Sequence, residues 1–296
     1  MQNEKNSPPI RFVGFGEAAR AIVAGWGPET ASRARAYDLK LEVAEARHEI
    51  VAAAQALSAS ASSTLEELFD GRAGVVFCLV TADQAAAAAE TAAPIIPPGT
   101  IWLDGNSCAP GTKRRAAAAI ELAGGRYVDL AIMAPILPRR HRTPMLVAGP
   151  HAAQAREVLR AFDMDVEIAG GVVGDASSIK MIRSVIIKGL EALTAECLLA
   201  ARRAGVEEQV LASFEASDPG FAWRKRSLYN LGRMSEHGIR RAAEMREVAL
   251  TLRELGLPDR MSVAATAWQE QIGDLELDLA DELPGALDQT LAALDR

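Results

Sequence analysis

The stretch Ile10-Arg11-Phe12-Val13-Gly14-Phe15-Gly16-Glu17-Ala18-Ala19 decides the fold of the first half of the chain. Its apolar start is typical of a short buried strand, and the G-x-G-x-x-A pattern after it leads into a helical segment, residues 20–26. In such a pattern the first glycine permits a tight turn, the second lets backbone N–H groups approach a pyrophosphate, and the alanine keeps the helix close to the strand. We therefore predict dinucleotide binding by Gly14, Phe15, Gly16, Glu17 and Ala18, with a purely structural turn as the alternative.

Asp38 ends the second apolar run, about two dozen residues after the glycines. A carboxylate there would accept hydrogen bonds from the adenosine ribose hydroxyls and would repel a 2′-phosphate. We therefore expect NAD as the cofactor, while the nearby Lys40 leaves NADP possible. The alternative role for Asp38 is to cap a loop.

Short apolar runs alternate with helical patterns as far as residue 170, which is typical of β-α-β units in a parallel sheet. Strands are expected at residues 11–13, 34–38, 75–80, 100–104, 127–132 and 144–148. Helices are expected between them, including residues 41–59 and 82–93. The predicted fold is an α/β Rossmann-type N-terminal domain over residues 1–172, followed by an all-α C-terminal domain over residues 173–296.

The second half of the chain contains one long helical pattern, from Ser177 to Gly205 without a proline. A helix of this length needs cover on much of its circumference, either from other helices of its domain or from a second subunit. We expect a homodimer formed through the C-terminal helical domain.

Polar residues form a stripe on this helix, because Lys180, Ser184, Lys188 and Glu191 recur at i, i+4, i+8 and i+11. One interpretation is a solvated face that carries a Lys188–Glu191 pair. The other is that Lys180 points into the cleft between the domains. The chain has 6 lysines and otherwise uses arginine for its positive charge, and a lysine ammonium can be tuned to titrate whereas a guanidinium cannot.

The composition, with 49% hydrophobic and 24% charged residues and a net charge of −7, is that of a globular protein. An acidic chain has no positive field that would attract a polyphosphate backbone, so we expect no nucleic-acid partner. The N-terminus is polar and no stretch approaches the ~18 uninterrupted apolar residues of a membrane span. We therefore expect a cytoplasmic protein with no membrane partner.

The cysteines and histidines offer no metal site by their spacing. Cys78, Cys108 and Cys197 are far apart, and the four histidines are scattered. We expect reduced thiols, mostly structural, and no bound metal.

Several further motifs give the whole chain a resemblance to the β-hydroxyacid dehydrogenase superfamily, which contains 3-hydroxyisobutyrate and 6-phosphogluconate dehydrogenases. Besides the glycine turn, these motifs are Leu79-Val80-Thr81, Asp104-Gly105-Asn106-Ser107, Tyr127-Val128-Asp129, and Gly174 leading into Lys180-Met181-Ile182-Arg183-Ser184. The resemblance implies that Lys180 is the general acid/base and that Ser184 replaces an asparagine that helps to hold the substrate. It further implies cofactor contacts at Val80 and Thr81, contacts to substrate or nicotinamide at Asn106 and Ser107, and a substrate contact at Arg240.

The sequence also departs from the family pattern. Met133-Ala134-Pro135 stands where the family carries a Ser-Gly-Gly turn that grips the substrate carboxylate, so Met133 and Ala134 would line an altered substrate site. The strongly cationic segment Pro138-Arg139-Arg140-His141-Arg142 would then either bind an anionic substrate group or form an exposed loop. These departures imply a divergent branch of the family.

Three functions are compatible with the sequence. The first is an NAD(P)-dependent oxidoreductase that transfers a hydride between the nicotinamide and a small hydroxy acid or polyol acid, with Lys180 as general acid/base. The second is a reductase of C=N bonds on the same fold, because loss of the Ser-Gly-Gly turn relaxes the need for a carboxylate. The third is a nucleotide-binding regulatory protein without catalytic activity.

Overall fold

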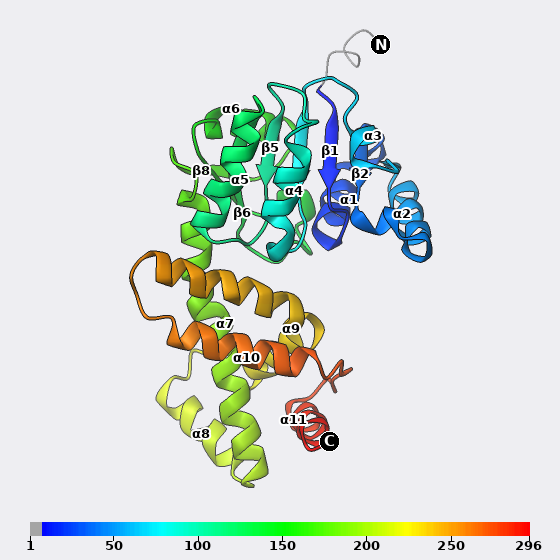
Figure 1. Ribbon diagram of the computed structural model, residues 1–296. Coiled ribbons are helices and arrows are strands. Elements are labelled where there is room, and N and C mark those ends of the chain that lie inside the picture. Colours follow the sequence, from blue (N-terminus) through cyan, green and yellow to red (C-terminus); the bar gives the residue numbers. More distant parts are fainter. Residues whose placement is uncertain (1–7) are drawn as a thin grey trace. The chain divides into compact units, whose positions relative to one another are not determined.

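The computed structural model describes residues 8–296 and divides the chain into two compact units (Figure 1). The first unit ends at Lys180 and the second begins at Met181, so the boundary falls inside the long helix α7, Asp175–Arg203. The first unit is a helix-covered sheet and the second is helical, which confirms the predicted fold class.

The first unit is built on an 8-stranded sheet with the order β3-β2-β1-β4-β5-β6-β7-β8. All neighbouring strands run parallel except β6 and β7, which are antiparallel. The strands are β1 Ile10–Val13, β2 Ala34–Tyr37, β3 Ser60–Ala61, β4 Val75–Cys78, β5 Ile101–Asp104, β6 Arg126–Ile132, β7 Met145–Ala148 and β8 Val166–Gly170.

Six of these strands are those that the sequence predicts, with ends that differ by at most two residues. The central strands β1, β4 and β5 are buried at every position, which explains why they are largely apolar rather than alternating between apolar and polar residues. The sequence did not indicate β3 and β8. The first has only 2 residues, and the second carries exposed positions at an edge of the sheet.

Helices connect most successive strands of the first unit and cover the sheet. They are α1 Glu17–Ala31, α2 Ala44–Ala56, α3 Leu65–Leu68, α4 Ala85–Ala92, α5 Pro110–Leu122 and α6 Ala152–Ala161. The helix expected over residues 41–59 is shorter than predicted, because a 3-10 turn, Leu39–Glu42, precedes it and Val43 adopts an extended conformation between the two. Residues 60–61 then pair as strand β3.

The core of the first unit contains a group of aromatic rings. Phe12 and Phe77, on the adjacent strands β1 and β4, stack with their centroids 5.0 Å apart, and Trp26 of α1 lies against both. This packing fixes α1 on the sheet and thereby fixes the turn that joins β1 to α1.

The second unit consists of helices joined by loops. It contains the remainder of α7 together with α8 Glu207–Ser217, α9 Trp223–Glu254, α10 Arg260–Gly273 and α11 Leu283–Leu294. Helices α9 and α10 approach each other closely at Gly238, where an added Cβ would lie 2.2 Å from the Gln269 carbonyl oxygen and 2.7 Å from the Gly273 Cα. Within residues 8–296, no helix has the length and apolar character needed to cross a bilayer.

The carboxyl ends of the central parallel strands lie at one edge of the sheet. At this edge β1 leads into the glycine turn, β4 into residues 79–81 and β5 into residues 105–108. Ligands of open parallel sheets bind outside this edge, so the fold brings the predicted cofactor residues to one place.

Candidate functional site

The two glycines of the β1–α1 turn have different structural requirements. Gly14 has a φ of +89°, and a Cβ there would lie 2.4 Å from the Leu79 carbonyl oxygen, so the fold itself requires a glycine. Gly16 is exposed and has a φ of −81°, and a Cβ there would meet no atom within 4 Å. The fold therefore explains Gly14 but not Gly16.

Helix α1 begins directly after Gly16. Glu17 and Ala18 lie in its first turn, and no side chain caps this end of the helix. Uncapped N–H groups and the positive end of the helix dipole favour an anionic ligand. The predicted residues Gly14 to Ala18 thus form one turn at the carboxyl edge, with the side chain of Phe15 buried in the core.

Asp38 lies directly beside this turn. Its Oδ2 accepts a hydrogen bond of 2.8 Å from the Phe15 amide, and its Oδ1 accepts one of 3.0 Å from the Lys40 amide. Two cations, Arg20 and Lys40, follow the glycine turn and Asp38 closely in the sequence. Both lie beside one carboxylate, since Glu49 is 3.0 Å from the Arg20 guanidinium and 4.0 Å from the Lys40 ammonium. The carboxylate that the sequence assigns to the ribose therefore also caps the turn after β2 and holds the glycine turn.

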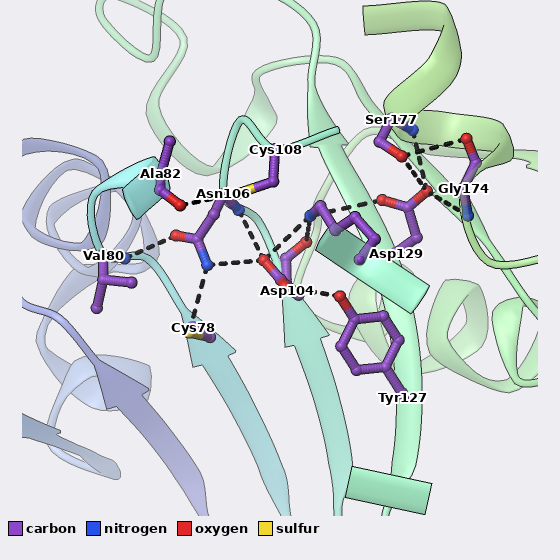
Figure 2. A network of polar contacts seen from close by, with 11 residues as sticks. Cys78, Val80, Ala82, Asp104, Asn106, Cys108, Tyr127, Asp129, Gly174 and Ser177 are labelled. Atoms are coloured by element: carbon purple, nitrogen blue, oxygen red, sulfur yellow. Dashed lines mark hydrogen bonds and ion pairs between the residues drawn. The ribbon is translucent and has the colours of Figure 1, made fainter. Parts of the chain in front are cut away.

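Asn106 connects the ends of β4 and β5 (Figure 2). Its Oδ1 accepts a hydrogen bond of 2.8 Å from the Val80 amide, while its Nδ2 donates to Asp104 Oδ1 at 2.7 Å and contacts Cys78 Sγ at 3.4 Å. The residue is only 4% exposed. In this structure Asn106 holds the loop that carries Val80 and the exposed Thr81, and its amide hydrogens are engaged within the protein.

A buried ionic cluster that the sequence did not indicate lies beside Asn106. The Lys113 ammonium donates to the Asp104 carbonyl oxygen at 2.6 Å and lies 3.0 Å from Asp104 Oδ1 and 3.5 Å from Asp129 Oδ1. Burial acts to lower the pKa of Lys113, but attraction to the two carboxylates outweighs it and raises the pKa above its usual value. The Tyr127 hydroxyl donates to Asp104 Oδ2 at 2.6 Å, and its burial raises the pKa of Tyr127 well above the usual value.

Asp129 connects this cluster to the start of α7 (Figure 2). Its Oδ2 accepts hydrogen bonds from the Gly174 amide at 3.1 Å, from the Ser177 amide at 3.0 Å and from Ser177 Oγ at 3.0 Å. Lys180, the predicted general acid/base, follows three residues later on α7 and is partly buried. The signals that could have revealed this cluster are an aspartate in each of two predicted buried strands, Asp104 and Asp129, and Lys113 as one of only 6 lysines in the chain.

Met133 and Ala134 follow strand β6 and are partly buried. The Met133 amide donates to the Pro144 carbonyl oxygen at 2.9 Å. The Met133 side chain packs against an apolar group that includes Ala131 and Ala176. This position therefore offers an apolar surface, with its backbone N–H already engaged. Ser107, the remaining predicted residue of the first unit, is partly buried in the loop after β5.

The cationic segment after Met133 forms a largely exposed turn, as one of its two interpretations expects. Arg139 and Arg140 are exposed, and Arg142 pairs with Asp163 through an Nε to Oδ2 hydrogen bond of 2.9 Å. His141 is the exception. It packs against Gly25 of α1, and burial lowers its pKa.

The part of the polar α7 stripe that belongs to the second unit is buried rather than solvated. Ser184, Lys188 and Glu191 are 6%, 5% and 3% exposed, so the interpretation as a solvated face is wrong. Lys188 lies 3.3 Å from Ser184 Oγ and 2.9 Å from Glu244 Oε2, and Glu244 also pairs with Arg240 at 2.8 Å. The predicted residues Ser184 and Arg240 thus belong to one polar network.

Glu191 has partners other than Lys188. Its Oε2 accepts hydrogen bonds from Arg241 Nε at 3.0 Å and from Gln269 Nε2 at 2.7 Å, and Arg241 Nη2 contacts its Oε1. The expected Lys188–Glu191 pair is therefore replaced by pairs to α9. The stripe faces inward because charged residues of α9 and a glutamine of α10 meet it.

The cysteines and the metal-binding side chains add nothing further to the site. Cys78, Cys108 and Cys197 form no disulfide bond, and burial raises the pKa of the Cys78 thiol above its usual range. In the part of the chain from residue 8 onward, no group of three or more His, Cys, Asp or Glu side chains could hold a metal ion.

Family models match a segment in each half of the chain. The profile of the NAD binding domain of 6-phosphogluconate dehydrogenase matches residues 24–170, and that of a domain of unknown function, DUF1932, matches residues 201–272. The first match begins after the glycine turn. Together with the sheet order and the glycine turn, it defines the first unit as a nicotinamide-dinucleotide-binding domain of the Rossmann class.

Solved structures resemble the whole chain. A conserved hypothetical protein from Sinorhizobium meliloti is 38% identical, with 96% of this chain and 95% of that chain covered and a TM-score of 0.72. Mycobacterium tuberculosis 3-hydroxyisobutyrate dehydrogenase with L-serine is 16% identical, with 96% and 99% covered and a TM-score of 0.70. The reductive aminase from Aspergillus terreus in complex with NADPH, 17% identical with 98% and 99% covered, has a TM-score of 0.53.

One curated relative is an uncharacterised 28.5 kDa protein of Methanothermus fervidus, 30% identical over 118 residues. The match spans 40% of this chain and 45% of that protein, so the chain spans less than half the length of this relative. The chain belongs to the β-hydroxyacid dehydrogenase superfamily, within a divergent branch.

Proposed function

We propose that this protein is an NAD-dependent oxidoreductase that transfers a hydride between the nicotinamide and a small hydroxy acid or polyol acid, with Lys180 as general acid/base. The observation that carries the proposal is Gly16, which stands at the uncapped start of α1 in a conformation open to any residue and with no atom within 4 Å of an added Cβ. Close approach of a ligand to the backbone accounts for a glycine that the fold does not require.

The residues at the carboxyl edge fit a nicotinamide dinucleotide. The backbone N–H groups of Glu17 and Ala18 would hold the pyrophosphate, and Asp38 would accept hydrogen bonds from the ribose. Val80 and Thr81 would lie along the bound cofactor, with Asn106 acting through its hydrogen bond to the Val80 amide. When bound, the cofactor would supply the hydride acceptor or donor.

NAD is preferred over NADP in this proposal because the Asp38 carboxylate is fixed beside the glycine turn. A 2′-phosphate at the ribose would meet this negative charge. Arg20 and Lys40 are the cations that could offset it, but Glu49 lies beside both. The cation charge near the ribose site is therefore partly neutralised.

Lys180 would move the proton of the substrate hydroxyl. Its neutral amine would accept this proton during oxidation, and the ammonium would return it during reduction. Ser184, four residues later on the same helix, would hydrogen-bond the substrate, and Arg240 would bind its acid group. In the first unit Ser107, Met133 and Ala134 would line the substrate site.

Titration of NADH and NADPH by fluorescence tests this proposal first. On the same sample, hydroxy acids with the oxidised cofactor and keto acids with the reduced one are followed at the nicotinamide absorbance. Tighter binding of NADH together with turnover supports the proposal. Binding without turnover on any substrate in either direction supports the nucleotide-binding regulatory alternative, and absence of binding contradicts both.

A reductase of C=N bonds is the second candidate, and the environment of Met133 favours it. An apolar side chain with an engaged backbone N–H cannot replace the donors of a Ser-Gly-Gly turn that holds a carboxylate. Cyclic imines and ketone–amine mixtures should therefore be included in the substrate panel. Turnover of imines but of no hydroxy acid or keto acid would favour this candidate.

We also propose a homodimer formed through the helical unit, in a cytoplasmic protein with reduced thiols. Apolar side chains of α7 and α10 are exposed in the single chain, with Ile182, Ile186 and Leu193 at 50%, 64% and 49% and Met261 at 55%. Such exposure supports cover by a second subunit. Ile186→Glu should reduce the mass measured by analytical ultracentrifugation to that of a monomer. The control Leu122→Glu changes a residue of the first unit that is 91% exposed and should not do so.

A further inference from the structure

Asp129 caps α7 from a neighbouring strand. Three hydrogen bonds reach its Oδ2, two from the Gly174 and Ser177 amides and one from Ser177 Oγ, across 45 and 48 residues of sequence. Amides at the start of a helix have no acceptor within the helix itself. The first turn of α7 is therefore attached to the middle of β6 by one buried carboxylate, which is 0% exposed.

Lys113 holds this carboxylate in place. Its ammonium lies between Asp129 and Asp104, which face each other in the register of β5 and β6. The Tyr127 hydroxyl holds the second oxygen of Asp104. All four side chains are at most 1% exposed, so none of the three charged groups has solvent as an alternative partner.

The charge of the cluster is compensated in part by the start of α7, and the start of α7 is capped by the cluster. Two carboxylates and one ammonium leave a negative charge in the interior, which is costly unless something compensates it. The positive end of α7 and its N–H groups provide this compensation at Asp129. Because well-packed apolar residues can stabilise a fold equally well, a buried ionic cluster at this place favours a defined geometry over added stability.

We propose that Asp129 and Lys113 are positioning residues that set the location of Lys180. The inference rests on the proposed function, in which Lys180 is the general acid/base. Lys180 lies three residues after Ser177 on the same helix, so a shift of the first turn of α7 displaces its side chain. A displacement of about 1 Å at a reacting group can lower a rate about 100-fold.

The main test compares Asp129→Asn with a control, Asp70→Asn. The asparagine nearly keeps the size of Asp129 but removes its charge, so we expect kcat to fall about 100-fold. The dissociation constant of NADH should change less than about twofold, because Asp38 and Asn106 hold the cofactor turn instead. Asp70 partners another buried cation, Arg11, but it precedes β4 and so lies at the amino end of the sheet. Its variant should leave kcat nearly unchanged.

Two milder or complementary variants keep the test decisive if Asp129→Asn folds poorly. Ser177→Ala removes one of the three hydrogen bonds to Asp129 and should lower kcat about 5-fold to 10-fold. Lys113→Met removes the ion that holds the carboxylate and should act in the same direction. A fall in cofactor affinity that matches the fall in kcat would overturn the positioning role.

Hydrogen exchange gives a readout that needs no substrate. Exchange in a peptide covering residues 175–184 should be at least about 10-fold faster in Asp129→Asn and Lys113→Met than in wild type, and unchanged in Asp70→Asn. Unchanged exchange in both cluster variants would overturn the inference whatever the activity. Full turnover by Lys180→Met would overturn the proposed general acid/base, and with it the positioning role.

Discussion

The carboxylate of Asp38 accepts a hydrogen bond of 2.8 Å from the backbone amide of Phe15, which lies 23 residues earlier in the chain. This bond joins the end of β2 to the middle of the glycine turn. The same carboxylate accepts from the Lys40 amide. Asp38 is therefore a structural part of the turn as well as the proposed ribose acceptor.

Replacement of Asp38 should affect NADH more than NADPH. Asp38→Asn leaves only one acceptor oxygen for two backbone amides and removes the charge that would repel a 2′-phosphate. We expect the NADH dissociation constant to rise about 10-fold, and the NADPH constant to rise less. Fluorescence titration of both cofactors measures the two constants. An equal loss for both would assign Asp38 to the turn alone.

The two glycines of the turn should respond to substitution in opposite ways. Gly16→Val should change the free energy of unfolding by no more than about 1 kcal/mol, since an added side chain meets no protein atom. It should raise the cofactor dissociation constant at least about 10-fold, because it occupies the space proposed for the pyrophosphate. Gly14→Ala places its Cβ against the Leu79 carbonyl at a positive φ and should destabilise the fold by about 2 kcal/mol or more. Denaturation and titration of both variants test this contrast.

Loss of the Lys180 amine should abolish catalysis but not cofactor binding. Lys180→Met should lower kcat about 1,000-fold while the NADH dissociation constant stays within about twofold. Lys180→Arg should not restore activity, because a guanidinium does not release its proton near neutral pH. The matched control is Lys225→Met, at an exposed position of α9. Equal rates for wild type and Lys180→Met would rule out the proposed role.

The crossing of α9 and α10 should tolerate no side chain at Gly238. Gly238→Ala would place its Cβ 2.2 Å from a backbone oxygen of α10, so we expect a loss of about 2 kcal/mol or more in the stability of the helical unit. Gly232→Ala, on the same helix with nothing within 4 Å of the added Cβ, should stabilise by about 0.5 kcal/mol. Peptide-resolved hydrogen exchange reports on the helical unit separately from the first. Similar effects of the two substitutions would contradict the close crossing.

Acid should weaken the first unit in part through Asp70. A hydrogen bond from Arg72, with further attraction from Arg11 and Arg72, holds the pKa of Asp70 at about 2, below its usual value of 3.8. The folded state is thus stabilised by ionised Asp70 above pH 3.8, and this contribution is lost as the pH falls toward about 2. We expect Asp70→Asn to be less stable than wild type by about 1 kcal/mol at neutral pH, after allowance for the partial exposure of the carboxylate. Urea denaturation as a function of pH should show this difference shrinking over the acidic range, and a constant difference would contradict the assignment.

The sequence determined the architecture of both halves because the relevant signals are local. A parallel strand that is buried at every position, such as β4, is apolar throughout, and a turn with a positive φ at Gly14 needs a glycine. The long proline-free pattern marked α7 to within two residues at each end. These features depend on neighbours along the chain, so the sequence displays them directly.

Tertiary structure decided which polar residues are buried and with what partners. The sequence of the polar stripe on α7 is the same whether the stripe is solvated or buried. It forms an interior network because Glu244 and Arg241 of α9 pack against it and pair with its charged residues. Likewise, Lys113 becomes a partner of Asp104 and Asp129 only when β5 and β6 pair in register. The free energy of a buried charge depends on the ions and dipoles around it, and residues far apart in sequence supply them. For this reason the sequence could single out Lys180 as a candidate, while the cluster that we propose to position it became visible only in the fold.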